Sequence, residues 1–216
     1  MLVSLLLDTS RKVPVFGVFS KNLPLQLCSG VGNTLEVFIA ALRQYLENKN
    51  LTWKEISEIV FCEGPGSTLG IRVVNLFLST LQVATKSFPL IRSFNSMILH
   101  GKMLWDEGNR IQKWVLVSDY KNQKFLALDS HSTLSEESIR VITDSTLASL
   151  DEKIYFIPQR RDTLPMVRNY QKIPYQPEKF SEVLLENPEV LKTVSLPRSF
   201  EPEKNTYQIW NGQRHQ

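Results

Sequence analysis

The sequence predicts an α/β protein with mixed sheets flanked by helices. Residues 2–7 form a short, nearly continuous apolar run of the kind found in a strand buried on both faces. Two further strand-like runs follow as a meander, and after them segments with helical spacing alternate with apolar strand-like runs. Alternation of strand and helix after an opening meander is typical of a mixed sheet with helices packed on it.

The composition is that of an ordinary globular protein with one large or two small domains. The chain has 216 residues, of which 42% are hydrophobic and 22% charged, which argues against disorder, a collagen helix and a coiled coil. The formal net charge is +3, and the lysines and arginines are scattered. This pattern does not indicate an autonomous nucleic-acid-binding surface.

The cysteines and the first apolar run indicate a cytoplasmic protein. Cys28 and Cys62 have no Cys or His at metal-ligand spacing and are interpreted as two reduced thiols. Residues 2–7 lack a basic leader and a small-residue cleavage site, so they are interpreted as a strand. No run is long enough to span a bilayer, and we expect no membrane contact.

Two lobes are predicted, residues 1–92 and a smaller, more divergent lobe at residues 93–216. In the first lobe, helical spacing predicts long helices at residues 34–46 and 69–84, and a capping box at residues 52–55 predicts a short helix to Glu58. The expected strands of this lobe are residues 2–7, 13–19, 23–28, 59–62 and 89–91.

The second lobe is expected to end in an irregular segment. Residues 188–216 show little periodicity and are expected to pack loosely against one lobe. The other elements expected here are helices at residues 95–106 and 178–186 and strands at residues 114–117, 125–128, 139–142 and 154–157.

A glycine-rich turn, Glu-Gly-Pro-Gly-Ser-Thr-Leu-Gly-Ile-Arg at residues 63–72, joins a predicted strand to the second long helix. Its three glycines allow backbone conformations with positive φ, while Pro65 fixes one position. Ser67 and Thr68 are capping candidates, and the N–H groups of a helix start can hold an anion. The turn is not a Walker A loop and misses the Gly-x-Gly-x-x-Gly spacing by one residue. A purely structural turn is the alternative.

The second long helix carries more apolar surface than one sheet contact requires. At about 100° per residue, its apolar positions cover an arc of roughly 240°. Four positions suffice to cover a sheet: Val73, Leu76, Phe77 and Ala84. A second stripe remains, which consists of Ile71, Val74, Leu78 and Leu81. This stripe is interpreted either as part of an ordinary core helix pair or as a docking face for another protein.

The sequence shows no convincing catalytic or metal-binding constellation. His100, His131 and His215 have no His or Cys partner at the spacing of a helix-borne metal pair. There is no Gly-x-Ser-x-Gly nucleophile elbow with a recognisable His and Asp. Asp8 follows a buried strand and can place a carboxylate near a metal or phosphate, although alone such a residue more often belongs to a turn.

Two motifs taken together resemble a known family. Leu-Leu-Leu-Asp-Thr-Ser at residues 5–10 and Gly-Pro-Gly-Ser-Thr-Leu-Gly-Ile-Arg at residues 64–72 are similar to the strand end and glycine turn of the bacterial tRNA threonylcarbamoyladenosine biosynthesis protein TsaB. The resemblance covers residues 1–128. It departs from the family at Thr68 and Leu69, where the family has Phe-Thr, and the His-x-x-x-His of the catalytic paralogue TsaD is absent.

The resemblance implies a two-lobed actin-like ATPase fold (ASKHA, ribonuclease H-like) and a chain without catalytic residues. It implies a partner subunit of the tRNA N6-threonylcarbamoyladenosine (t6A37) complex, which docks TsaD through its first-lobe helices and supports recruitment of the ATPase TsaE. Contact with tRNA would be indirect. No intrinsic cofactor is expected, and any ATP or ADP would be shared with the partner complex.

Two groups of candidate site residues follow from the resemblance and the helix pattern. The nucleotide-proximal group consists of Asp8, Thr9, Ser10, Gly64, Gly66, Ser67 and Arg72. The partner-interface group consists of Leu35, Phe38, Ile39, Leu42, Ile71, Val74, Leu78 and Leu81. No catalytic or metal-binding residue is assigned.

Two other hypotheses remain open. The chain could be an enzyme, either a small ASKHA-type nucleotide-dependent phosphotransferase or a peptidase-like protein, using Asp8 with the glycine turn. It could also form a homodimer through the same helices when the partner is absent.

Overall fold

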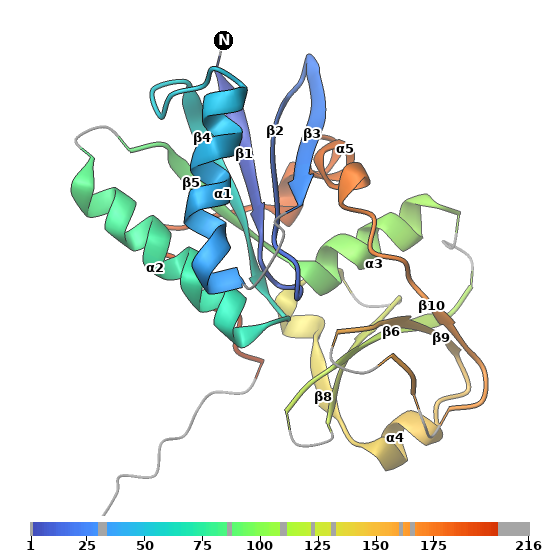
Figure 1. Cartoon of the computed structure of the whole chain (residues 1–216). Helices are drawn as coiled ribbons and strands as arrows, with labels where there is room; N and C mark the ends of the chain where they lie inside the picture. The colour runs from blue at the N-terminus through green and yellow to red at the C-terminus, as the bar shows by residue number, and fades with distance from the viewer. Residues whose placement is uncertain are drawn as a thin grey trace, which may run out of the picture.

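Two mixed β-sheets with helices between and around them build the protein (Figure 1). The computed structural model describes residues 2–29, 34–85, 88–108, 112–121, 124–130, 133–159, 162–164 and 167–202, without the side chains of residues 29 and 34–37. The strand order is β11-β5-β4-β1-β2-β3 in the first sheet and β10-β9-β6-β7-β8 in the second. The predicted α/β class with two mixed sheets is confirmed.

The first sheet contains both parallel and antiparallel pairs. β1 pairs antiparallel with β2 and parallel with β4, and β4 pairs parallel with β5. Its strands are β1 (Val3–Asp8), β2 (Val15–Ser20), β3 (Leu23–Ser29), β4 (Ile56–Gly64), β5 (Leu90–Asn95) and β11 (Lys192–Thr193). The helices that follow its strands are α1 (Thr34–Asn48), α2 (Thr68–Ala84) and α3 (Ser96–Asp106).

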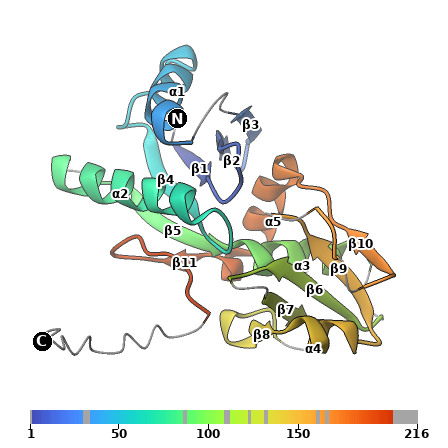
Figure 2. The ribbon, with the colours of Figure 1, turned by 60° about the horizontal axis from the view of Figure 1, so that its bottom comes forward.

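The second sheet is built around β6, which pairs antiparallel with β7 and parallel with β9. Its strands are β6 (Trp114–Asp119), β7 (Phe125–Asp129), β8 (Arg140–Ile142), β9 (Lys153–Ile157) and β10 (Tyr170–Lys172). The remaining helices are α4 (Asp144–Ala148), α5 (Phe180–Glu186) and the 3₁₀ helices η1 (Glu136–Ser138), η2 (Pro177–Lys179) and η3 (Pro188–Val190). After this sheet the chain returns to the first one, where β11 pairs antiparallel with β5 (Figure 2).

The apolar run of β1 is explained by the layers on its two faces. Leu5 and Leu7 pack in a core shared with α1 and α2, whereas Leu6 packs in a core shared with α3, α5 and the second sheet. A third core lies on the far face of the second sheet, under α4. Alternating side chains of a strand point to opposite faces, so a strand between two cores must be apolar at nearly every position.

The short helix predicted at residues 52–58 is wrong, although its capping contacts form. The Thr52 amide and hydroxyl both donate to Glu55 Oε2, at 2.7 and 3.0 Å, and close a single turn. The chain then enters β4 at Ile56, which is buried in the core beside α1 and α2. Pairing of β4 with β1 and β5 therefore outweighs the local preference for helix.

In the described part of the chain, no helix combines the length and the apolar character needed to cross a bilayer.

Leu76 and Leu78 provide a direct test of which side of α2 faces the first sheet. Leu78 is fully buried between α2 and the sheet, whereas Leu76 points to solvent. We expect Leu78→Ala to lower the free energy of unfolding by about 2–4 kcal/mol, since it leaves a cavity, and Leu76→Ala to change it by less than about 0.5 kcal/mol. Urea unfolding of both variants measures the difference. Equal costs would contradict this orientation of α2.

Candidate functional site

β1 ends in a buried carboxylate with both oxygens engaged. The Ser10 amide donates to Asp8 Oδ1 at 2.8 Å, and the Tyr175 hydroxyl donates to Oδ2 at 2.8 Å. Burial and the neighbouring Asp8 charge raise the pKa of Tyr175, so its hydroxyl stays protonated and acts as the donor. Groups of the chain itself thus bind the carboxylate that the sequence analysis placed near a nucleotide.

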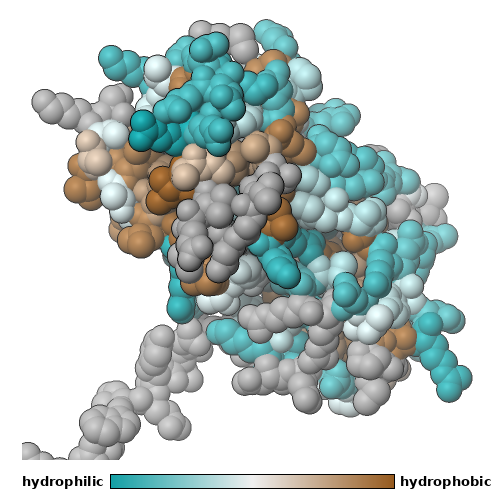
Figure 3. Space-filling view, in the orientation of Figure 1, coloured by the Kyte–Doolittle hydropathy of each residue, from teal (hydrophilic) through white to brown (hydrophobic). Residues whose placement is uncertain are grey.

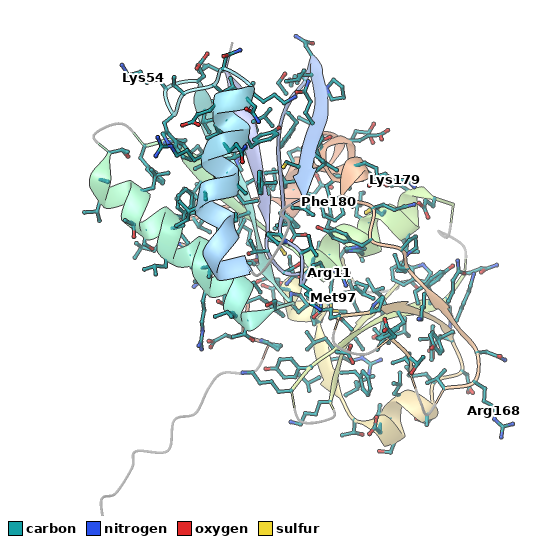
Figure 4. All side chains as sticks on the ribbon, in the orientation of Figure 1. Arg11, Lys54, Met97, Arg168, Lys179 and Phe180 are labelled. Carbon is teal, nitrogen blue, oxygen red and sulfur yellow. The ribbon has the colours of Figure 1, made fainter. Side chains whose placement is uncertain are left out.

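Arg11 connects this carboxylate cluster to the second sheet. Its guanidinium lies over the Tyr175 ring, 4.9 Å from the ring centroid, and its Nη1 donates to the carbonyl of Pro158, which directly follows β9. Figure 4 shows Arg11 close to Met97, the second residue of α3, at the junction of the two sheets. The cluster therefore connects the end of β1 in the first sheet to the end of β9 in the second sheet.

The glycines of the turn at residues 63–72 allow a close approach of backbone to backbone. A Cβ on Gly66 would lie 2.4 Å from the Ser10 Cβ, and one on Gly70 would lie 2.0 Å from the Thr9 carbonyl oxygen. The Ser67 amide donates to the Ser10 carbonyl at 2.6 Å, and the Ser67 hydroxyl accepts from the Gly70 amide as the helix cap. The predicted cap is confirmed at Ser67. The residues after β1 therefore pack directly against the turn.

Glu63, the residue before these glycines, belongs to a buried polar cluster that the sequence analysis missed. Its carboxylate accepts from Ser93 Oγ at 3.1 Å and from Lys192 Nζ at 3.3 Å, and Lys192 also pairs with Glu136. Burial, together with the hydrogen bond and charge of Glu136, raises the pKa of Glu63 to about 7. Its partners come from β5, β11 and η1, so no local sequence signal could have indicated the cluster.

A cleft of about 300 Å³ opens between the glycine turn, the β6–β7 turn and the last described residues. Of the predicted nucleotide-proximal residues, Gly66 and Arg72 line it. Asp8, Thr9, Ser10, Gly64 and Ser67 are not among its lining residues. The remaining wall comes from Pro65, Thr68, Ile71, Asp119, Tyr120, Lys121, Gln159, Ser199, Phe200, Glu201 and Pro202. Nucleotide proximity stays a prediction.

Most of the predicted partner-interface residues lie in the core of the chain itself. Four of them are buried in the core with the first sheet, namely Phe38, Leu42, Val74 and Leu78, and Ile71 is buried beside the cleft. Leu81 is partly buried on the same core, Ile39 is 55% exposed, and the Leu35 side chain lies outside the described residues. The assignment of the two stripes of α2 is therefore corrected, because the stripe reserved for a partner covers the sheet.

The other stripe of α2 is divided, because Val73 and Phe77 pack partly on the core whereas Leu76 faces solvent. Leu69, Leu76 and Val83 are 50%, 70% and 89% exposed. With Val73 and Thr80 they form a row, spaced alternately by four and three residues, that we call the α2 seam. The Thr80 hydroxyl donates to the Leu76 carbonyl at 2.8 Å, so its hydrogen-bonding need is met within the helix. Figure 3 shows hydrophobic side chains gathered over α2.

The histidines form no metal site among the described residues. His100 is buried in α3, where its Nδ1 bonds the Ser96 carbonyl at 2.6 Å and burial lowers its pKa to about 4. His131 and His215 lie outside the described residues. Within the described ranges, no three His, Cys, Asp or Glu side chains lie close enough together to hold a metal ion.

Comparisons with known proteins show the fold. No family model matches the sequence, and no curated protein matches it either. Two solved structures from Pseudomonas aeruginosa are similar over 88% of this chain and 93% of their own. One, an uncharacterized protein with similarity to the peptidase YeaZ, has a TM-score of 0.62 at 12% identity. The other, YeaZ, has a TM-score of 0.60 at 13% identity. The chain thus has the α/β fold of these two structures, with two mixed sheets flanked by helices.

The close approach at Gly70 predicts an unusual mutational effect. Gly→Ala inside a helix normally stabilises by about 0.5–1 kcal/mol. Here we expect Gly70→Ala to destabilise by roughly 1–3 kcal/mol, since the Thr9 backbone must move. Thermal unfolding alongside Ser79→Ala, on the same helix, provides the measurement and its control. A stabilised Gly70→Ala protein would contradict the packing described above.

The polar cluster around Glu63 predicts a pH dependence of stability. The pKa of Glu63 in the folded chain lies above the ordinary value of 4.5. The stability that protonated Glu63 contributes to the folded chain is therefore complete below pH 4.5 and is lost as pH rises through about 7. Between pH 5 and 8 we expect the free energy of unfolding of the wild type to fall by on the order of 2–3 kcal/mol as Glu63 ionises. Glu63→Gln, which mimics the protonated form, should not show this decrease. Urea unfolding across this range measures it, and identical pH profiles for the two proteins would exclude this role.

Proposed function

We propose that the chain is a non-catalytic partner subunit of the t6A37 tRNA modification complex, which docks a TsaD-type catalytic subunit through the α2 seam. The observation that carries the proposal is the row of exposed aliphatic side chains on a helix that is already packed against α1 and the sheet. Burying one such side chain is worth about 1.5–3 kcal/mol, so three of them contribute roughly 5–9 kcal/mol towards offsetting the cost of association. Ile39 of α1 is exposed as well.

Two further features support a partner role over an enzymatic one. Asp8 is bound by Tyr175 and Ser10, and the glycine turn is filled by Thr9 and Ser10. The carboxylate and the helix start that a nucleotide enzyme of this fold would use are therefore engaged within the chain. The likeness to YeaZ, the protein also called TsaB, agrees with the two sequence motifs that resemble the same family.

The other expectations that follow from the resemblance to TsaB are part of the same proposal. A TsaE-type ATPase would join the assembly, tRNA would be reached through the catalytic subunit, and the complex would be cytoplasmic. ATP or ADP would bind beside Arg72 in the cleft only as a ligand shared with the partner complex. A homodimer through α2 would form when the catalytic subunit is absent.

An enzyme remains the second candidate because the cleft brings Arg72 and Lys121 together in a space of about 300 Å³. Calorimetric titration of the isolated chain with ATP and Mg²⁺ separates the two proposals. The partner role predicts no turnover and no effect of Asp8→Ala on nucleotide binding. Tight binding with turnover that Asp8→Ala abolishes would establish the enzyme.

The partner role predicts that Leu76→Asp abolishes co-purification with the TsaD-type subunit of the same organism. The variant should keep its fold, because Leu76 is exposed and a charge there disturbs only an association. Size-exclusion chromatography measures the complex, and circular dichroism checks the fold. Leu185→Asp, on α5 at the far side of the first sheet (Figure 1), serves as the control. A complex that survives Leu76→Asp unchanged would refute docking through the seam.

A further inference from the structure

Another cavity, of about 190 Å³, lies between α3 and the chain that joins β10 to η2. One wall is a single face of α3, on which His100, Met103, Leu104 and, at the C-cap, Glu107 recur at a spacing of three or four residues. Tyr155 of β9 contributes to the lining as well. We call this space the α3 cavity. It shares no described lining residue with the cleft at the glycine turn, so the two are separate sites.

His100 brings a hydrogen-bond acceptor to this wall. The residue is 1% exposed, and its Nδ1 bonds the Ser96 carbonyl. Because a carbonyl only accepts, Nδ1 carries the proton, and the lowered pKa of about 4 keeps the ring neutral at pH 7. Nε2 therefore has a lone pair, and no described residue donates a hydrogen bond to it. Buried polar atoms normally have a partner, so this one indicates a group that is bound from outside the chain.

The surroundings of His100 favour a neutral donor. Met103 and Leu104 are buried, and Ile173 is partly buried against the same core. The carboxylate that lines the described part of the cavity belongs to Glu107, which is half exposed and already paired with Lys179. A cationic donor beside His100 would lose its hydration without an opposing charge. A hydroxyl group can donate to Nε2 without this cost.

The volume of the α3 cavity limits the size of the ligand. An apolar cavity of about 150 Å³ holds one benzene ring, so a volume of about 190 Å³ takes one ring with a small substituent. A two-ring base would need more room and several hydrogen-bond partners. Met103 has a flexible side chain, and its thioether makes favourable contacts with aromatic rings. A hydroxyl on a single aromatic ring therefore matches the size and the lining of the cavity.

An exposed ion pair lies at the entrance of the α3 cavity. Lys179 Nζ, from η2, is 2.9 Å from Glu107 Oε1 at the end of α3, and both residues line the cavity (Figure 4). The two side chains are 43% and 51% exposed. Exposed ion pairs contribute little to stability, so separating this one costs little. A small molecule can thus enter from solvent without unfolding α3.

We infer that the α3 cavity binds a neutral single-ring phenol, whose hydroxyl donates to His100 Nε2 and whose ring packs on Met103 and Leu104. The two observations that carry the inference are the buried acceptor and the one-ring volume beside it. The α3 cavity lies on the opposite side of the first sheet from α2, so this site is independent of the proposed docking.

Binding of p-cresol and p-methylanisole to the whole chain tests the inference. The two probes share a ring and a methyl group, but methylation of the oxygen removes the donor. We expect saturable binding of p-cresol, about five- to tenfold tighter than that of p-methylanisole, because only the phenol forms the buried hydrogen bond. NMR titration of the isotope-labelled chain measures both affinities. The nitrogen resonance of His100 Nε2 should move to lower frequency with p-cresol, as a lone pair that accepts a hydrogen bond does.

Two variants distinguish the acceptor from the cavity. His100→Phe retains a ring beside Phe180 but removes the acceptor, so the two probes should bind this variant with equal affinity. Ile173→Trp fills the cavity from the side opposite α3 and should abolish binding of both probes. Val83→Trp, at an exposed position on α2, is the matched control and should bind like the wild type. Circular dichroism checks the fold of each variant.

The outcomes decide the inference without the TsaD-type subunit. Absence of saturable p-cresol binding to the wild type would overturn it, and so would binding that Ile173→Trp leaves unchanged. Equal affinities of the two probes for the wild type, or an unchanged His100 Nε2 resonance, would show that His100 accepts no hydrogen bond and would also overturn it. Each of these results leaves the proposed function untouched, because Leu76→Asp tests that function separately.

Discussion

The close contact between the end of β1 and the start of α2 is the constraint on which the rest of the structure depends. Gly66 and Gly70 let the glycine turn lie directly on the Thr9 and Ser10 backbone. This contact fixes where α2 begins, and so which of its side chains face the sheet. It also engages the Ser67 amide, which donates to the Ser10 carbonyl at 2.6 Å. One packing requirement thus sets both the start of the helix and its orientation on the sheet.

Three sides of α2 are in contact with the rest of the chain, and the fourth side is the proposed docking surface. α1 packs on one flank through the edge-to-face contact of Phe38 and Phe77, and the sheet covers the second side. Residues 195–199 lie on the third side, where Ser195 and Ser199 accept from Gln82 and Asn75. The side that remains carries the seam. The exposed side chains of Leu69, Leu76 and Val83 add little to the core of the chain, which is why a partner accounts for them better than the core does.

The sequence predicted the fold well and the site less well, for reasons that lie in particular residues. The run at residues 2–7 and the spacing of α1 and α2 depend on local periodicity, which a sequence displays directly. The width of the apolar arc on α2 was also visible, but periodicity does not say which part of an arc faces the sheet. The pairs of Asp8 with Tyr175 and of Glu63 with Lys192 join residues 167 and 129 positions apart, so no local pattern indicates them.

The central claim is that the α2 seam is covered when the chain works. Hydroxyl-radical labelling of the chain alone and with its TsaD-type subunit measures this directly, because labelling reports side-chain exposure. We predict that Leu76 and Val83 lose their labelling in the mixture while Leu185 on α5 keeps its own. Equal labelling of Leu76 and Val83 with and without the catalytic subunit, at concentrations that saturate a complex, would contradict the claim.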